Sequence, residues 1–157
     1  MMEKRTVLQI CGLGAISGLR TMSGLALLAR ALQQRPPQHW PHAVVRRMAT
    51  EPAPTLLQLM AAGELVADKL PFLSARTAPP ALAGRATSGA VVGATVSMLH
   101  DRSPLLGAAL GGSAALVAAF AGYHARRLLT GEERLPDFLV ALLEDGLVWG
   151  LGKRLAG

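Results

Sequence analysis

The chain has 157 residues and a mass of 16.4 kDa, which gives room for one domain over residues 1–157. Hydrophobic residues make up 51% of it and aromatic residues only 4%, a composition too apolar for a disordered chain. The single cysteine, Cys11, excludes a disulfide scaffold, and the sequence has no Walker, H-E-x-x-H or C-x-x-C motif, so we expect no enzyme, no metal and no cofactor.

The net charge of +6 would be compatible with nucleic-acid binding, but its distribution favours another partner. Half of the sixteen basic residues come in four dispersed pairs: Lys4-Arg5, Arg46-Arg47, Arg126-Arg127 and Lys153-Arg154. These pairs flank apolar segments, as basic residues do beside membrane-spanning helices, rather than lining one continuous face. We therefore expect a lipid bilayer as the partner and no nucleic acid.

The first apolar segment, Val7–Ala29, has 23 residues and is interrupted only by Arg20. About 20 helical residues cross a bilayer, so this length predicts a membrane helix. No small-x-small cleavage site follows it, which favours an uncleaved helix over a signal peptide. The polar, proline-rich stretch 33–54 predicts only a short interfacial helix around His42–Ala49.

The next two apolar segments carry charged residues. Leu56–Leu70 lies between Pro54 and Pro71 and is the weakest candidate, because it contains two carboxylates and one lysine. Leu82–Leu99 has Arg85 near its start and is otherwise uncharged. Both are predicted to be helical, and the first leaves the number of membrane crossings open.

Leu105–Tyr123 is the clearest membrane segment, with 19 residues and no charge. A soluble bundle is the alternative, but its helices would show polar faces at a 3.6-residue period, which this segment lacks. Phe138–Gly152 follows, with Glu144-Asp145 at its centre. The sequence thus predicts an all-α, multi-pass membrane bundle of four to five helices. The positive-inside rule gives no orientation for five spans and favours both termini outside for four.

Glycines spaced four residues apart recur on four different predicted helices. The pairs are Gly14/Gly18, Gly89/Gly93, Gly107/Gly111 and Gly146/Gly150. Such spacing places two missing side chains on one helix face, where another backbone can approach closely. Tight packing within one bundle is the favoured interpretation, and the interface of a homo-oligomer is the alternative.

An internal repeat is suggested by the pattern R-x-x-S-G. It occurs at 20–24 and again at 85–89, and each copy is followed by a helix with an acidic centre. Duplicated units are common in small transporters, but a match of five positions also arises by chance.

Seven ionisable residues lie within apolar segments, where charges are costly and indicate either internal pairing or an ion or solute path. They are Arg20, Glu64, Asp68, Lys69, Arg85, Glu144 and Asp145. Glu64 and Asp68 project from one helix face, so an arginine from a neighbouring helix, a shared proton or a bound cation is expected to relieve their repulsion. The residues serve either as structural salt bridges, as a proton- or cation-coupled site, or as snorkelling groups at helix ends.

Several of these residues belong to motifs that resemble a known family. The motifs are Gly18-Leu19-Arg20, Glu64-Leu65-Val66-Ala67-Asp68-Lys69-Leu70-Pro71, Gly84-Arg85-Ala86 and Glu144-Asp145. They are similar to a bacterial family of small integral membrane proteins known only as a domain of unknown function. The resemblance implies a helical protein of the bacterial cytoplasmic membrane and brings no activity with it.

The sequence accordingly favours a small transporter or channel-like protein for an ion or small solute, with a charged core inside the membrane. The alternative is a non-transporting membrane scaffold or accessory subunit, in which the same charges are structural.

Overall fold

The first apolar segment folds into two helices separated by a sharp break. The computed structural model describes residues 3–34, 42–67, 78–129 and the single positions 146, 148, 150, 152 and 154. Helix α1 covers Lys4–Leu19 and α2 covers Ser23–Gln33. Arg20 ends α1 with extended backbone angles, φ −139° and ψ 110°. The prediction of one helix over Val7–Ala29 is therefore wrong. The helix can be interrupted because backbone groups at the break form hydrogen bonds to side chains of other helices.

Four further helices follow in the described residues. They are α3 (Ala43–Ala49), α4 (Ala53–Ala67), α5 (Pro79–Leu99) and α6 (Pro104–Leu129). Helix α3 lies where a short helix was predicted, and α5 and α6 contain the predicted segments 82–99 and 105–123. The part of the chain that the structure describes contains no strand, which confirms the all-α class.

A tight turn joins α5 to α6. Asp101 adopts the left-handed region with φ 51°, which aspartate tolerates better than most residues. The amide of Arg102 donates to the carbonyl of Ser97 at 2.9 Å, and the amide of Asp101 donates to the carbonyl of Met98 at 3.3 Å. These two bonds form a Schellman motif, which closes α5 and directs α6 back along it.

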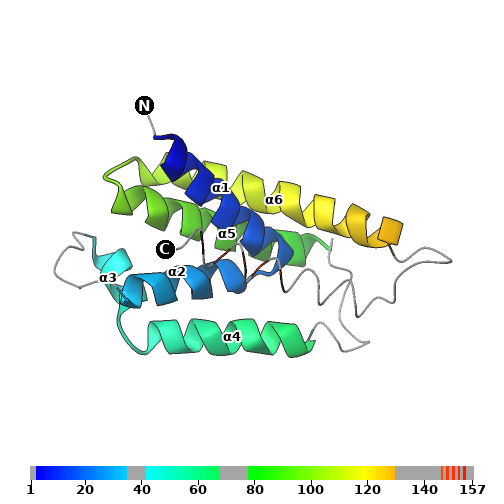
Figure 1. Cartoon of the computed structure of the whole chain (residues 1–157), viewed down its shortest axis with the longest axis horizontal. Helices are drawn as coiled ribbons and strands as arrows, with labels where there is room; N and C mark the ends of the chain where they lie inside the picture. Colours follow the sequence, from blue (N-terminus) through cyan, green and yellow to red (C-terminus); the bar gives the residue numbers. More distant parts are fainter. Residues whose placement is uncertain are drawn as a thin grey trace.

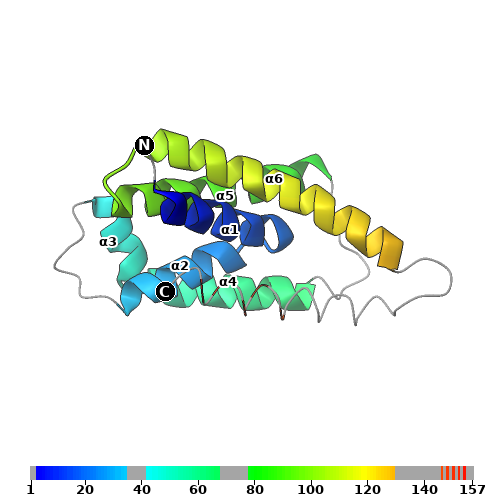
Figure 2. The ribbon, with the colours of Figure 1, turned by 45° about the horizontal axis from the view of Figure 1, so that its top comes forward.

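Helices α1, α5 and α6 pack against one another, and α2 connects them to α4 (Figure 1). After the break, α2 runs back toward the end of the bundle at which α1 begins. Helix α4 then lies along the other side of α2, as the tilted view makes clear (Figure 2). The buried core includes Ile10, Leu13 and Leu28 from the first two helices and Val92 and Val96 from α5.

Glycines form the contacts among α1, α5 and α6. A Cβ on Gly14 would lie 2.6 Å from the carbonyl oxygen of Gly111, and a Cβ on Gly89 would lie 2.5 Å from the same oxygen. A Cβ on Gly93 would come closer still to the carbonyl oxygen of Gly107, and a Cβ on Gly18 to that of Ala115. Six of the eight predicted packing glycines, on three helices, therefore bring backbones together within one chain.

Gly146 and Gly150 behave differently from the other predicted packing glycines. Both are exposed, and among the described atoms nothing lies within 4 Å of a Cβ built at either position. Close packing of this pair therefore stays a prediction, and the buried described positions of this segment are Val148 and Gly152. Val148 belongs to the core, and a Cβ on Gly152 would meet Leu27 of α2.

One described helix, α6, is long and apolar enough to cross a membrane, over Pro104–Ala125. This agrees with the segment predicted at Leu105–Tyr123. The apolar part of α4, Ala53–Val66, is shorter than a span. Within the described ranges no second helix meets both conditions, so the membrane bundle of four to five helices stays a prediction. Phe138–Gly152 lies outside the described residues, apart from four single positions.

The two copies of R-x-x-S-G have different backbone structures. Residues 20–24 form the break and the start of α2, whereas residues 85–89 lie inside α5. The two copies therefore do not mark equivalent positions of a duplicated helical unit.

Candidate functional site

The carboxylate of Glu64, on α4, is held at the break between α1 and α2. One carboxylate oxygen accepts a hydrogen bond from the amide of Thr21 at 2.7 Å, and the other accepts one from the amide of Met22 at 2.8 Å. Met22 is the N-cap residue of α2 and Thr21 directly precedes it, so both amides lie at the N-terminal end of this helix, where backbone donors lack a helical partner. The negative charge is stabilised there by charge-assisted hydrogen bonds and by the helix dipole.

Helix α5 binds the same break from another side. The hydroxyl of Ser88 donates to the carbonyl of Thr21 at 2.5 Å. Gly84 lies one turn earlier, where a Cβ would be 3.9 Å from the Thr21 methyl carbon. Glu64 and Ser88 together thus satisfy three backbone polar groups that lose their helical partners at the break, which removes the main penalty for interrupting a buried helix.

Two buried arginines accompany this arrangement. Arg20 is 2% exposed and directly precedes Thr21, and Arg85 is 7% exposed and lies on α5 between Gly84 and Ser88. Both arginines have polar or electrostatic interaction partners. Burying a guanidinium is costly unless such partners neutralise or hydrogen-bond it. The fold therefore brings Arg20, Glu64 and Arg85, three of the seven predicted site residues, to one place.

The other four predicted site residues are Asp68, Lys69, Glu144 and Asp145, and they lie outside the described residues. Asp68 directly follows the last residue of α4. The acidic pair at 144–145 precedes a segment whose described positions contact α1 and α2, through Val148 and Gly152.

The end of α1, next to the break, packs on the second half of the candidate membrane segment. Gly18 is packed on Ala115, and the side chain of Leu19 lies 2.8 Å from the position of a Cβ on Gly122. Both partners on α6 fall within Pro104–Ala125. If α6 crosses a membrane, the end of α1 lies beside the second half of the span, and an unsatisfied backbone group at the break is then especially costly.

The geometry is that of an anion-binding helix terminus already occupied by a carboxylate of the same chain. Among the described residues, no group of three or more His, Cys, Asp or Glu side chains is arranged to hold a metal ion. The sequence did not identify Thr21 and Met22 as participants, because they act through backbone amides. For Ser88, the repeated R-x-x-S-G pattern was the feature of the sequence that singled this residue out.

Comparison with known families identifies one match. The family described as a domain of unknown function (DUF4126) matches residues 7–152, so the chain belongs to this family. No curated protein and no solved structure shows significant similarity to the chain.

Proposed function

We propose that this DUF4126 protein is a multi-pass protein of the bacterial cytoplasmic membrane that moves a small ion or solute past the α1–α2 break. In this proposal the Glu64 carboxylate occupies the anion site formed by the two amides at the break in the resting protein, and Arg20 and Arg85 supply the neighbouring positive charge. The observation that carries the proposal is the Glu64 carboxylate, which accepts hydrogen bonds from two backbone amides at the break between α1 and α2.

The membrane part of the proposal is supported by the outer surface of the bundle. Large apolar side chains are exposed on five of the described helices: Leu8 on α1, Val44 on α3, Leu56, Leu59, Met60 and Val66 on α4, Val91 on α5, and Leu105, Leu106, Val117, Phe120 and Leu128 on α6. A soluble protein seldom leaves so many large apolar side chains uncovered. Lipid is the partner that covers several sides of one bundle at once.

The transport part is supported by the form of the break. Discontinuous helices are a recurrent device in transporters, because their free termini bind charged groups at membrane depth. Exchange of the Glu64 carboxylate for a solute anion would free the two amides for that anion without unfolding the bundle. This exchange couples anion binding to a local movement of α4 relative to α2.

A structural scaffold is the second candidate, and one observation favours it. Glu64 on α4 and Ser88 on α5 both form hydrogen bonds to the break, so these contacts hold α4, α5 and the break together. In a scaffold these hydrogen bonds would persist, and Arg20 and Arg85 would only neutralise buried charge.

Purified protein in proteoliposomes separates these functions. We expect flux of H⁺, K⁺ or Cl⁻ down an imposed gradient in the wild type, and its loss in Glu64→Gln. The glutamine presents an NH₂ group to one of the two amides, so we also expect a stability loss of about 1.5–3 kcal/mol. Flux is therefore compared per folded molecule, with Glu3→Gln, an exposed carboxylate, as the matched control.

A wild-type protein that carries none of the three ions under any gradient would remove the ion-transport form of the proposal. Unchanged flux in Glu64→Gln, once corrected for the folded fraction, would show that Glu64 only stabilises the fold. Loss of stability without any wild-type flux is the result expected of a scaffold.

A further inference from the structure

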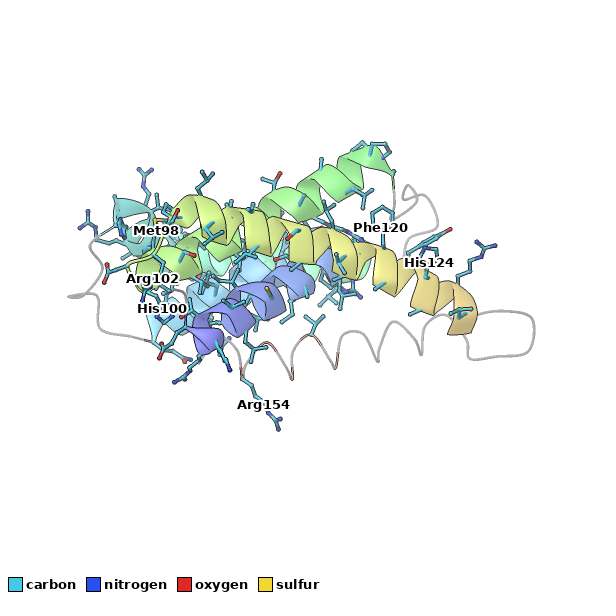
Figure 3. The ribbon with its side chains drawn as sticks, turned by 90° about the horizontal axis from the view of Figure 1, so that it is seen from above. Met98, His100, Arg102, Phe120, His124 and Arg154 are labelled. Atoms are coloured by element: carbon cyan, nitrogen blue, oxygen red, sulfur yellow. The ribbon has the colours of Figure 1, made fainter. Side chains whose placement is uncertain are left out.

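Basic residues that are far apart in the sequence meet at one end of the bundle. The start of α1, the end of α2, helix α3 and the α5–α6 turn all lie at this end (Figures 1 and 2). Hydrogen bonds connect these parts: His100 pairs with Gln9 at 3.3 Å, and Gln33 donates to Glu51 at 2.8 Å. In the side-chain view, His100 and Arg102 lie at this end, whereas Phe120 and His124 lie toward the other (Figure 3).

We call this surface the basic end. Among the described residues, its exposed cations are Lys4, Arg5, Arg30, Arg46, Arg47 and Arg102, and its exposed carboxylates are Glu3, Glu51 and Asp101. Six positive and three negative charges leave an excess of three positive charges. Arg30 lies in the last turn of α2, and Arg46 and Arg47 lie in the last turn of α3. An excess of this kind attracts the anionic surface of a membrane.

A groove opens at the basic end between α3 and the start of α4. Its volume is about 630 Å³, and its lining residues are Val44, Arg47, Met48, Thr50, Glu51, Pro52, Ala53 and Leu56. A second hollow of about 550 Å³ adjoins it, where Arg46 and Arg47 both contribute to the wall. The guanidinium groups are suited to a phosphate, and most of the remaining lining is apolar.

An apolar stripe continues from the groove along α4. Val44 and Leu56, both 53% exposed, form its beginning. Leu59, Met60 and Val66 follow on α4 and are also exposed. From Leu56 to Val66 the helix rises by about 15 Å, which is enough to lie against much of one acyl chain. A cationic groove thus leads into an apolar track, the arrangement that an amphiphile with an anionic head requires.

We propose that this groove binds an anionic phospholipid, with its phosphate at Arg46 and Arg47 and an acyl chain along the α4 stripe. The inference rests on the membrane location proposed above and is independent of transport. Glu51 lies on the rim of the groove and accepts a hydrogen bond from Gln33. Its negative charge opposes a phosphate, so removal of this charge is expected to strengthen binding.

The test uses full-length protein in neutral detergent, titrated with fluorescent phosphatidylglycerol or with phosphatidylcholine that has the same acyl chains. We expect the wild type to prefer phosphatidylglycerol. Each membrane-surface cation contributes about five-fold to the affinity for anionic lipid, so Arg46→Gln with Arg47→Gln should weaken binding about thirty-fold. Arg127→Gln removes an exposed cation from the far end of α6 and should leave the affinity unchanged.

Two further arms sharpen the result. Glu51→Gln should raise the affinity for phosphatidylglycerol, and Leu56→Gln should lower it, because one removes repulsion and the other interrupts the apolar track. Equal binding of the two lipids, or equal weakening by Arg127→Gln and by the Arg46/Arg47 variant, would overturn the proposal. Release of the lipid by inorganic phosphate beyond that caused by chloride at the same ionic strength would also overturn it, since the site would then recognise phosphate alone.

Discussion

Gly14 and Gly111 lie so close together that a Cβ on Gly14 would stand 2.6 Å from the carbonyl oxygen of Gly111 and 2.9 Å from its Cα. The atoms it would meet belong to the backbone and cannot rotate away. Gly111 meets Gly89 of α5 as well, so this one residue of α6 brings three helices together. Side-chain size at these positions therefore limits the stability of the whole bundle.

Gly14→Ala should destabilise the protein. The overpacking penalty is about 1–3 kcal/mol, and the gain of about 1 kcal/mol in helix propensity offsets only part of it. The matched control is Gly63→Ala on α4, where a Cβ would meet nothing within 4 Å of the described surroundings. That control should be neutral or stabilising by up to about 1 kcal/mol. Unfolding of both variants in the same detergent measures the difference, and equal stabilities would contradict the close packing.

Much of the helical structure follows from local sequence signals. The uncharged run Leu105–Tyr123 predicts α6, and Ser103-Pro104 marks its start because proline is favoured in the first helical turn. The short helix around His42–Ala49 is likewise predicted from its proline-rich flanks. These signals lie within the elements that they describe, so no tertiary contact is needed to interpret them.

The break at Arg20 could not be predicted in the same way. The run Val7–Ala29 has helical composition throughout, and the groups that stabilise its interruption lie 43 and 67 positions away, on Glu64 and Ser88. The expected partners of Glu64 were an arginine, a proton or a cation, whereas the described partners are backbone amides. Backbone donors carry no residue identity, so a search for complementary side chains does not find them.

Ser88→Ala should destabilise the protein by about 0.5–1.5 kcal/mol, because the carbonyl of Thr21 loses a buried donor. Ser113→Ala is the control, since the Ser113 hydroxyl is exposed and bonds to the carbonyl of Leu110 in its own helix at 3.0 Å. Thermal unfolding of the two variants gives the comparison. A larger loss at Ser113 than at Ser88 would show that the break does not depend on α5.

Val117→Lys tests whether α6 crosses the bilayer. Val117 is 70% exposed and lies well inside Pro104–Ala125, so a lysine there should cost about 2.5–3.5 kcal/mol of membrane insertion. Leu128→Lys is the control, because Leu128 is 69% exposed but lies beyond the span, where a lysine reaches the interface. The fraction of full-length protein that resists carbonate extraction is the readout. Equal extraction of both variants and the wild type would indicate that α6 lies outside the membrane.

The basic end predicts the orientation of the chain. The positive-inside rule places Lys4, Arg5 and the α3 arginines in the cytoplasm, which differs from the outside termini favoured for a four-span count. In a Cys11→Ser background, His42→Cys at this end should react with an impermeant maleimide only after the cells are permeabilised. His124→Cys, exposed toward the other end of α6, should react in intact cells. The reverse pattern would contradict the assignment, and labelling of both positions in intact cells would indicate insertion in two orientations.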